Sequence, residues 1–152
     1  MAIPLISIPP ADQIKLKVER SLRHYNKLLK ELKDKPLEPD TIHFIANQIT
    51  TIEALNFQLK TSSRKIKQSK QQLLTYLQKN EGIYPKNHFM SLYMAVGMTA
   101  VGIPAGIVFS FLVNNTAFIG IGLPIGLSIG LAIGHQKDLK IKAKGKQINY
   151  AL

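Results

Sequence analysis

The sequence predicts an all-α protein in which a cytoplasmic, antiparallel coiled-coil helical hairpin is followed by a transmembrane helical hairpin. The chain of 152 residues holds 9 acids and 20 bases, yet 48 consecutive positions, from Asn87 to Gly134, contain no Asp, Glu, Lys or Arg. In the N-terminal half, apolar residues recur three and four positions apart among charged ones, as in an amphipathic helix. We therefore divide the chain into an extended apolar segment (1–10), a coiled-coil hairpin (11–80), a transmembrane hairpin (87–134) and a basic cytoplasmic tail (135–152).

The first ten residues, MAIPLISIPP, are apolar and contain three prolines. Proline fixes φ and lacks an N–H, so we expect an extended segment here. It lacks the basic start and the small-residue cleavage site of a secretory signal peptide. The chain contains no cysteine, which excludes disulfides, thiolate metal sites, thiol nucleophiles, prenylation and palmitoylation.

Two helices are expected between residues 11 and 80. The first carries apolar residues at positions 18, 22, 25, 29 and 32 and is interrupted by Pro36 and Pro39. Asp40 is a suitable N-cap for the second, which we expect to reach Lys79 without a break because its heptad seam continues without slip. The coiled-coil seam residues of the second helix are Ile42, Ile45, Ile49, Ile52, Asn56, Leu59, Ile66, Leu73 and Leu77.

The first helix is expected to fold back antiparallel along the second. Two helices bury only a thin core, so further copies of the chain or a protein partner would add burial. Asn56 is interpreted either as a residue that fixes the register of the seam or as the exposed edge of a weak apolar stripe. The basic run SSRKIKQSK either faces solvent or contacts anionic lipid. No aromatic residues interleave with it, and we therefore expect no nucleic acid as a partner.

The uncharged block divides at a polar turn, residues 114–116. This turn separates 25 mostly apolar residues, 89–113, from the 18 residues 117–134. A membrane core of ~30 Å needs ~20 helical residues, so each segment is able to cross once, and the short turn makes the crossings antiparallel. A buried hairpin in a soluble protein is the alternative, and it is disfavoured because soluble helices avoid so many glycines.

Lysines flank only the outer ends of the two spans, so the positive-inside rule places both termini in the cytoplasm. We expect the lysines after the second span to contact lipid headgroups. These are Lys137, Lys140, Lys142, Lys144 and Lys146. The membrane is interpreted as a bacterial inner membrane, or as a host membrane if the protein is secreted.

Small residues four apart form one smooth face on each span. In lipid, helices associate through close backbone packing, which small residues allow. The predicted helix-packing residues are Gly102, Gly106, Ser110, Gly122, Gly126, Gly130 and Gly134. A second small face, at positions 124, 128 and 132, lies about 200° around the helix. Either one face closes the hairpin while the other joins copies into a homo-oligomer, or the small residues only close the hairpin. Pro104 is expected to kink the first span.

No pattern in the sequence indicates an enzyme, a metal site or a cofactor. The four histidines lack metal-ligand spacing, and no His-Glu-x-x-His motif or paired carboxylates occur. His88 and His135 flank the spans on the same side. They are interpreted as interface or spacer residues, or alternatively as a pH sensor.

The stretch IGLPIGLSIGLAIGHQKDLKIKAKGKQI, the second span and its exit, resembles the small bacterial glycine-zipper two-span membrane proteins. In these, repeated I-G-x-x units end in a basic helix, and the likeness covers roughly residues 90–148. The resemblance implies a membrane hairpin and a bacterial source, and it implies no particular activity. The coiled-coil part lies outside it.

Two functions remain. The first is a non-enzymatic bacterial membrane protein that self-associates through a glycine zipper and presents a cytoplasmic coiled coil as an adaptor or scaffold. The alternative is an oligomeric membrane-perturbing or pore-forming toxin or effector. The spans contain few polar groups to line a pore and no charged residue, so the adaptor is favoured. Membrane lipids are the expected partners of both.

Overall fold

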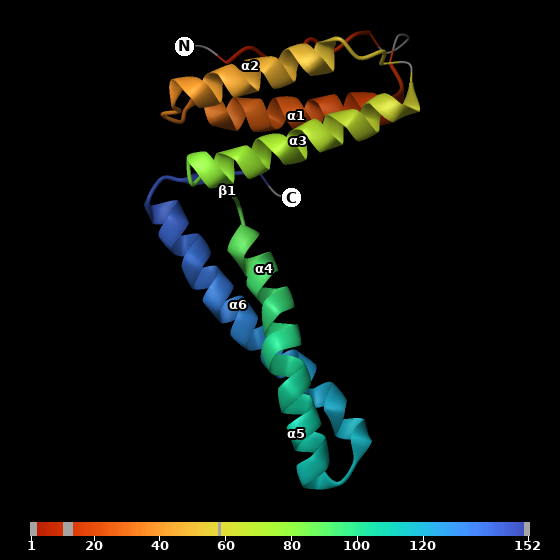
Figure 1. Cartoon of the computed structure of the whole chain (residues 1–152), viewed down its shortest axis with the longest axis vertical. Coiled ribbons are helices and arrows are strands. Elements are labelled where there is room, and N and C mark those ends of the chain that lie inside the picture. Colours follow the sequence, from red (N-terminus) through yellow and green to blue (C-terminus); the bar gives the residue numbers. More distant parts are fainter. Residues whose placement is uncertain (1–2, 11–13, 58, 151–152) are drawn as a thin grey trace. The chain divides into compact units, whose positions relative to one another are not determined.

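The computed structural model describes residues 3–10, 14–57 and 59–150, and these are mostly helical (Figure 1). The chain divides into two compact units. The first unit comprises the described residues up to Tyr84 together with Ile148–Tyr150, and the second is Pro85–Gln147. Two short strands, β1 (Tyr84–Pro85) and β2 (Gln147–Ile148), pair in a two-stranded sheet.

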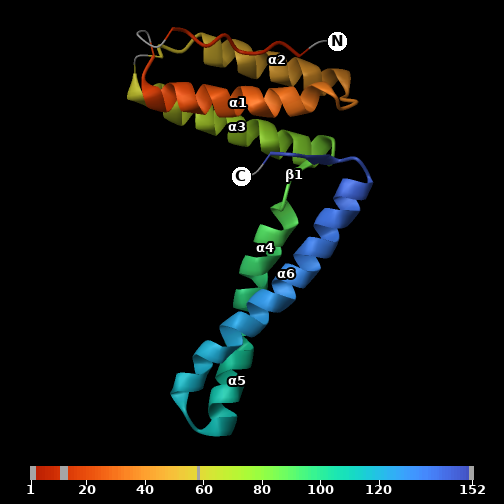
Figure 2. The ribbon, with the colours of Figure 1, turned by 180° about the vertical axis from the view of Figure 1, so that it is seen from behind.

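The described residues of the first unit contain three helices. They are α1 (Leu16–Lys33), α2 (Pro39–Glu53) and α3 (Lys60–Asn80). The helix α3 contacts both α1 and α2, and the three run side by side in the front and back views (Figures 1 and 2). Each helix is amphipathic and turns its apolar stripe inward, so that Leu22, Ile45 and Leu73 are almost completely buried.

The prediction of one unbroken helix from residue 42 to residue 79 is wrong. The helix α2 ends at Glu53, and α3 begins only at Lys60. A turn lies between them, in which the carbonyl oxygen of Asn56 accepts hydrogen bonds from the Ser62 hydroxyl at 2.6 Å and from the Leu59 N–H at 3.2 Å. Asn and Ser favour such turns because their side chains bond to nearby backbone.

The expected two-helix coiled coil is therefore replaced by a three-helix arrangement. Folding α3 back supplies the burial that two helices lack. Most of the predicted seam lines this core, since Ile45, Ile49, Ile52, Ile66, Leu73 and Leu77 are buried. Ile42 is half-buried, whereas Asn56 and Leu59 lie in the turn between α2 and α3, and Leu59 is 54% exposed.

Polar links fix the three helices against one another. The hydroxyls of Ser21 on α1 and Ser63 on α3 hydrogen-bond at 2.9 Å. The phenol of Tyr25 lies 3.4 Å from the Ser69 hydroxyl, which donates to Gln48 Oε1 on α2. Burial raises the pKa of the Tyr25 phenol above its usual value, and the hydrogen bond with Ser69 opposes this shift. Buried links of this kind fix how each helix is rotated, because leaving them unpaired is unfavourable.

The C-terminal strand completes the first unit. Ile148 is fully buried and Tyr150 is 2% exposed. Lys70 Nζ donates to the Tyr150 hydroxyl at 3.1 Å and lies 5.3 Å from the centre of its ring. The backbone N–H of Asn149 donates to the Glu31 carboxylate at 3.0 Å. Part of the segment expected as a basic tail is therefore core.

We expect Tyr25→Phe to reduce the free energy of unfolding by about 1 kcal/mol at pH 8, because a buried hydrogen bond is lost. The pKa of Tyr25 is raised in the folded state, so its contribution is complete below the unfolded pKa of about 10 and falls as pH rises through the folded value. Native protein should therefore lose more stability between pH 8 and pH 11 than the variant does. Urea unfolding in mild detergent, followed by circular dichroism, measures both effects.

The matched control is Tyr76→Phe, since the Tyr76 ring is only half-buried and stacks on Phe44 at 4.1 Å. This variant keeps the buried Tyr25 phenol and should still lose more stability between pH 8 and pH 11 than Tyr25→Phe does. An equal loss of stability between pH 8 and pH 11 in native protein and in Tyr25→Phe would refute the role given to the buried phenol.

Candidate functional site

The second unit is a helical hairpin, and it holds most of the predicted functional residues. Its first arm is nearly continuous helix and its second arm is one long helix after a short 3-10 turn (Figure 1). The elements are α4 (His88–Gly97), the π-helical turn η2 (Met98–Gly102), α5 (Ile103–Val113), the 3-10 turn η3 (Thr116–Phe118) and α6 (Ile119–Ala143). All parts of the first arm contact α6.

The polar turn predicted at residues 114–116 reverses the chain. Asn114 adopts the left-handed conformation, φ 54° and ψ 37°, and ends α5. Asn115 then caps η3, because its side-chain oxygen accepts a hydrogen bond from the Ala117 N–H at 2.9 Å. Asparagine suits both positions, since it tolerates left-handed backbone and bonds to amides two residues ahead.

Small residues bring the two arms into backbone contact. The buried residues of α6 recur every four positions, as Gly122, Gly126, Gly130, Gly134 and Asp138. Gly122 and Gly126 lie against the backbone of Gly97, Gly102 and Gly106 in the first arm, and Gly130 and Gly134 lie against the backbone at Tyr93 and Met90. The small residues of the first arm, Gly97, Gly102, Gly106 and Ser110, are all buried. A Cβ atom added at Gly126 would lie 2.3 Å from the carbonyl oxygen of Gly97, and one added at Gly122 would lie 2.0 Å from that of Gly102. All seven predicted helix-packing residues thus lie inside the hairpin.

The sequence reasoning did not include Gly97 in this face. It stands five residues before Gly102, whereas the other small residues of this arm are four apart. The π-helical turn Met98–Gly102 accommodates the extra residue and returns Gly97 to the same face. Pro104 lies two residues after this turn and lacks an N–H for the carbonyl oxygen of Ala100, which accounts for the departure from α-helix geometry at this place.

The outer surface of the hairpin is apolar. Large side chains there are exposed, among them Val108, Phe111 and Leu112, which are 59%, 80% and 79% exposed. The hydroxyls bond within their own helices, as Thr99 donates to the Ala95 carbonyl at 3.1 Å and Ser128 to the Pro124 carbonyl at 2.8 Å. This distribution is the reverse of that in a water-soluble helical pair, because small residues are inside and large apolar ones outside.

A buried carboxylate closes the open end of the hairpin. Asp138 on α6 is 5% exposed, and its two oxygens accept the N–H groups of Phe89 at 3.1 Å and Met90 at 2.9 Å. These are among the first N–H groups of α4, which have no partner within the helix and carry partial positive charge. Sequence reasoning missed this role, although Asp138 continues the four-residue period of the glycines and is the one acid after Glu81.

Lysine side chains lie at the same end of the hairpin. Lys137 Nζ donates to the Tyr93 hydroxyl and lies 4.5 Å and 5.8 Å from the ring centres of Tyr93 and Phe89. The other lysines predicted to contact headgroups, Lys140, Lys142, Lys144 and Lys146, are also exposed. The helix α6 ends just before Gly145, whose φ of 69° is the left-handed conformation that terminates many helices.

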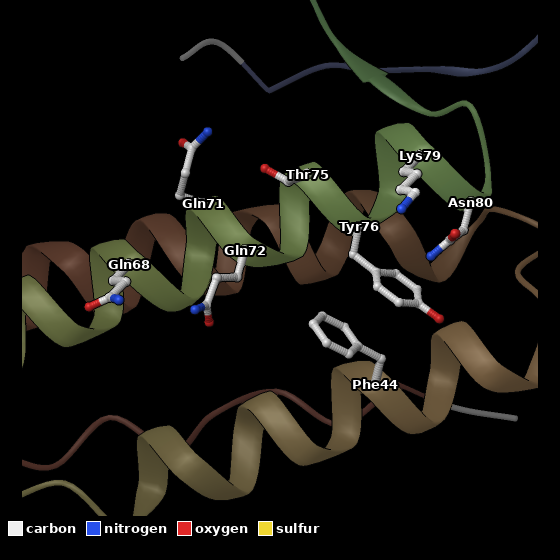
Figure 3. A pocket seen from close by; sticks show the side chains of 8 residues that line it. All are labelled: Phe44, Gln68, Gln71, Gln72, Thr75, Tyr76, Lys79 and Asn80. Atoms are coloured by element: carbon white, nitrogen blue, oxygen red, sulfur yellow. The ribbon is translucent and has the colours of Figure 1, made fainter.

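The first unit carries an open cleft of about 710 Å³ along α3. It is lined by Phe44, Gln68, Gln71, Gln72, Thr75, Tyr76, Lys79 and Asn80. Figure 3 shows the ring of Phe44, which comes from α2, stacked on the ring of Tyr76, with Gln72 and Asn80 of α3 on either side of the pair. Neither a nucleophile–base pair nor paired carboxylates occur among these lining residues. Within the described part of the chain, no group of three His, Asp or Glu side chains is placed to hold a metal ion.

Both arms of the hairpin are long and apolar enough to cross a membrane. The helical stretches His88–Val113 and Thr116–Ala143 each contain a window with a mean hydropathy of 2.0, of which only 22% is buried. Comparison of the chain with protein-family models, curated proteins and solved structures finds no match. The resemblance to small glycine-zipper proteins therefore stays a prediction.

We expect Gly126→Ala to destabilise the hairpin by about 1–3 kcal/mol, because the new methyl group meets the backbone of the opposite arm. The melting temperature in mild detergent, measured by circular dichroism, should fall by about 2–4 °C for each kcal/mol lost.

The control is Gly120→Ala on the same helix, since a Cβ atom at Gly120 has nothing within 4 Å. That change should leave the melting temperature unchanged or raise it slightly, because alanine favours helix. Equal melting temperatures for the two variants would contradict the packing described here.

Asp138→Ala should open the start of α4. Loss of the carboxylate leaves two N–H groups without partners, and we expect about 1–2 kcal/mol of local destabilisation. Hydrogen exchange at Phe89 and Met90, measured by mass spectrometry on the detergent-solubilised protein, should become about tenfold faster for each 1.4 kcal/mol. Lys140→Ala, which changes an exposed neighbour, should leave this exchange at the native rate. Unchanged exchange in Asp138→Ala would refute the capping role.

Proposed function

We propose that this protein is a non-enzymatic membrane anchor with two spans, and that its three-helix unit acts as an adaptor for another protein. One observation carries the proposal: the hairpin buries its glycines and exposes its large apolar side chains. In water each exposed square ångström of apolar surface costs about 25 cal/mol, so such a surface needs a cover. A lipid bilayer supplies one.

The contacts inside the hairpin support the same proposal. Between lipid-exposed helices there is no hydrophobic drive, so association depends on close packing of the kind seen at Gly122 and Gly126. Backbone polar groups within a membrane also need partners, which helices provide. The hydroxyls of Thr99 and Ser128 bond to carbonyl groups of their own helices, so they too tolerate lipid.

The charges support an orientation with both termini in the cytoplasm. Lys137, Lys140 and Lys142 extend from one end of the hairpin, and the turn at the other end is uncharged. The contacts of Lys137 with Tyr93 and Phe89 are typical of the headgroup region, where aromatic rings and lysine ammonium groups meet.

An adaptor is favoured over a pore because the hairpin exposes few polar groups, and no charged residue within residues 89–134, to line a conducting lumen. Self-association stays a prediction. The glycine face is closed within one hairpin, so a second copy would pack on another surface. The second small face, Pro124, Ser128 and Ala132, is exposed and suits that role.

Single cysteines test the anchor, because the native chain contains none and therefore gives no background. Thr116→Cys in the turn should react with a membrane-impermeant maleimide added to intact cells. Lys65→Cys on α3 should react only after the cells are permeabilised. Ser128→Cys, in the middle of α6, should react with the reagent only after denaturation, because lipid excludes it.

The outcome that contradicts the proposal is equal labelling of Ser128→Cys and Thr116→Cys before denaturation. Recovery of folded protein in the supernatant after ultracentrifugation without detergent would contradict it as well.

A further inference from the structure

The N-terminal segment packs on the first unit as an extended peptide does on its receptor. Residues 3–10 form neither helix nor strand, yet Ile3 and Ile6 are only 4% and 2% exposed. The residues between and after them are exposed, and Pro9, three positions after Ile6, is half-buried. Burial at every third residue is the period of a polyproline II helix, which the segment's three prolines favour.

One side chain of α1 holds the backbone of this segment. Asn26 Nδ2 donates to the Ile6 carbonyl oxygen at 2.8 Å, and Asn26 Oδ1 accepts from the Ile6 N–H at 3.0 Å. The amide thus pairs with both main-chain groups of a single residue. A polyproline II helix has no internal hydrogen bonds, so its main chain is available for such recognition. This contact selects an extended backbone at the Ile6 position and does not select the side chain there.

Beside the segment lies an open cleft of about 470 Å³ with a basic wall. It is lined by Leu5, Ile6 and Ile8 of the segment and by Arg23, Asn26, Lys27 and Lys30 of α1. Arg23 pairs with Glu19 at 2.6 Å. Residues 3–10 contain no acid, so the segment offers no charge to complement Lys27 and Lys30. Residues 3–10 therefore complement the apolar part of the site, and they leave Lys27 and Lys30 without a complementary charge from the segment.

We propose that the surface of the first unit that residues 3–10 cover at Asn26, called the groove below, forms together with the basic wall beside it a binding site for an extended peptide with two aliphatic residues three positions apart and an acidic residue between or just after them. The protein's own N-terminal segment occupies the groove until such a peptide displaces it. The inference rests on the proposed adaptor function, for which it names the chemical kind of partner.

Displacement is feasible because the hold on the segment is small. The segment is held by the buried side chains of Ile3 and Ile6 and by the Asn26 amide. Its covalent tether adds an effective concentration in the millimolar range. A partner that repeats these contacts and adds a carboxylate beside Lys27 and Lys30 gains an interaction that the segment lacks.

The test uses the full chain in detergent micelles and acetylated, fluorescent peptides, with binding read by anisotropy. The first peptide, IPLISIPP, copies residues 3–10, and the second, IPEISIPP, carries glutamate in place of Leu5. The third, SPLSSIPP, lacks both buried isoleucines and is the control. Ile3→Ser/Ile6→Ser, called the emptied variant, removes both buried side chains of the segment from the full chain.

We expect the emptied variant to bind IPLISIPP about tenfold or more tightly than native protein does, because the tethered segment has lost both buried side chains and competes less well. IPEISIPP should bind severalfold more tightly again at low salt. That gain should disappear at high salt and in the additional variant Lys27→Gln/Lys30→Gln, since both remove the charge pairing. Asn26→Leu in the emptied variant should weaken both peptides about tenfold or more, as two hydrogen bonds are lost.

The inference is overturned if the folded, emptied variant binds neither isoleucine peptide up to about 1 mM, or if SPLSSIPP binds equally well. If the double substitution lowers helical content in circular dichroism, Ile6→Ala alone shortens one buried side chain, weakens the hold on the segment, and gives the same comparison with a smaller gain. If the two isoleucine peptides bind equally tightly, the acidic residue assigned to the partner peptide contributes nothing, and that part of the proposal is wrong. Maleimide labelling of Ser128→Cys tests the membrane anchor independently of peptide binding. Failure of one proposal is therefore distinguishable from failure of the other.

Discussion

Direct contact between the backbones of α6 and of the first arm is the interaction on which the hairpin depends. Gly97, Gly102 and Gly106 of the first arm meet Gly122 and Gly126 of α6, each with a hydrogen in place of a side chain. Farther along α6, Gly130 and Gly134 lie against the backbone at Tyr93 and Met90. Helices this close have no room between them for large side chains. Those side chains therefore lie on the outside, and the apolar exterior is a direct consequence of the glycine interior.

The same constraint explains two features that look like irregularities. The period of four in α6 requires a matching period in the first arm, but Gly97 and Gly102 are five residues apart, and the π-helical turn restores the match. At the open end the series continues with Asp138 in place of a further glycine. A carboxylate fits there because the first arm begins at that level and presents N–H groups, which a glycine would leave unbonded.

The sequence was sufficient to predict the two apolar spans, the turn at residues 114–116 and the faces that the glycines occupy, because these follow from local period and composition. It was insufficient for Gly97, which departs from the four-residue period, and for Asp138, whose partners Phe89 and Met90 are distant in the chain. The break between α2 and α3 was missed for a related reason. The heptad period continues through Asn56 and Leu59, so pattern alone favours one helix, whereas the turn is stable only because α3 then packs on both α1 and α2.

The first unit reaches a sufficient core by recruiting both ends of the chain. Three short helices are complemented by Ile3 and Ile6 from one end and by Ile148 and Tyr150 from the other. The two ends are held differently. The C-terminal strand is fixed by a fully buried isoleucine, by Lys70 and by the Glu31 carboxylate, and the chain that enters it comes directly from the hairpin. The N-terminal segment is tied at one residue by a single amide and leaves Leu5 and Ile8 exposed. Residues 3–10 are therefore the part of this core that a partner displaces most easily. Their displacement from α1 breaks no helix and leaves the chain's connections to the hairpin intact.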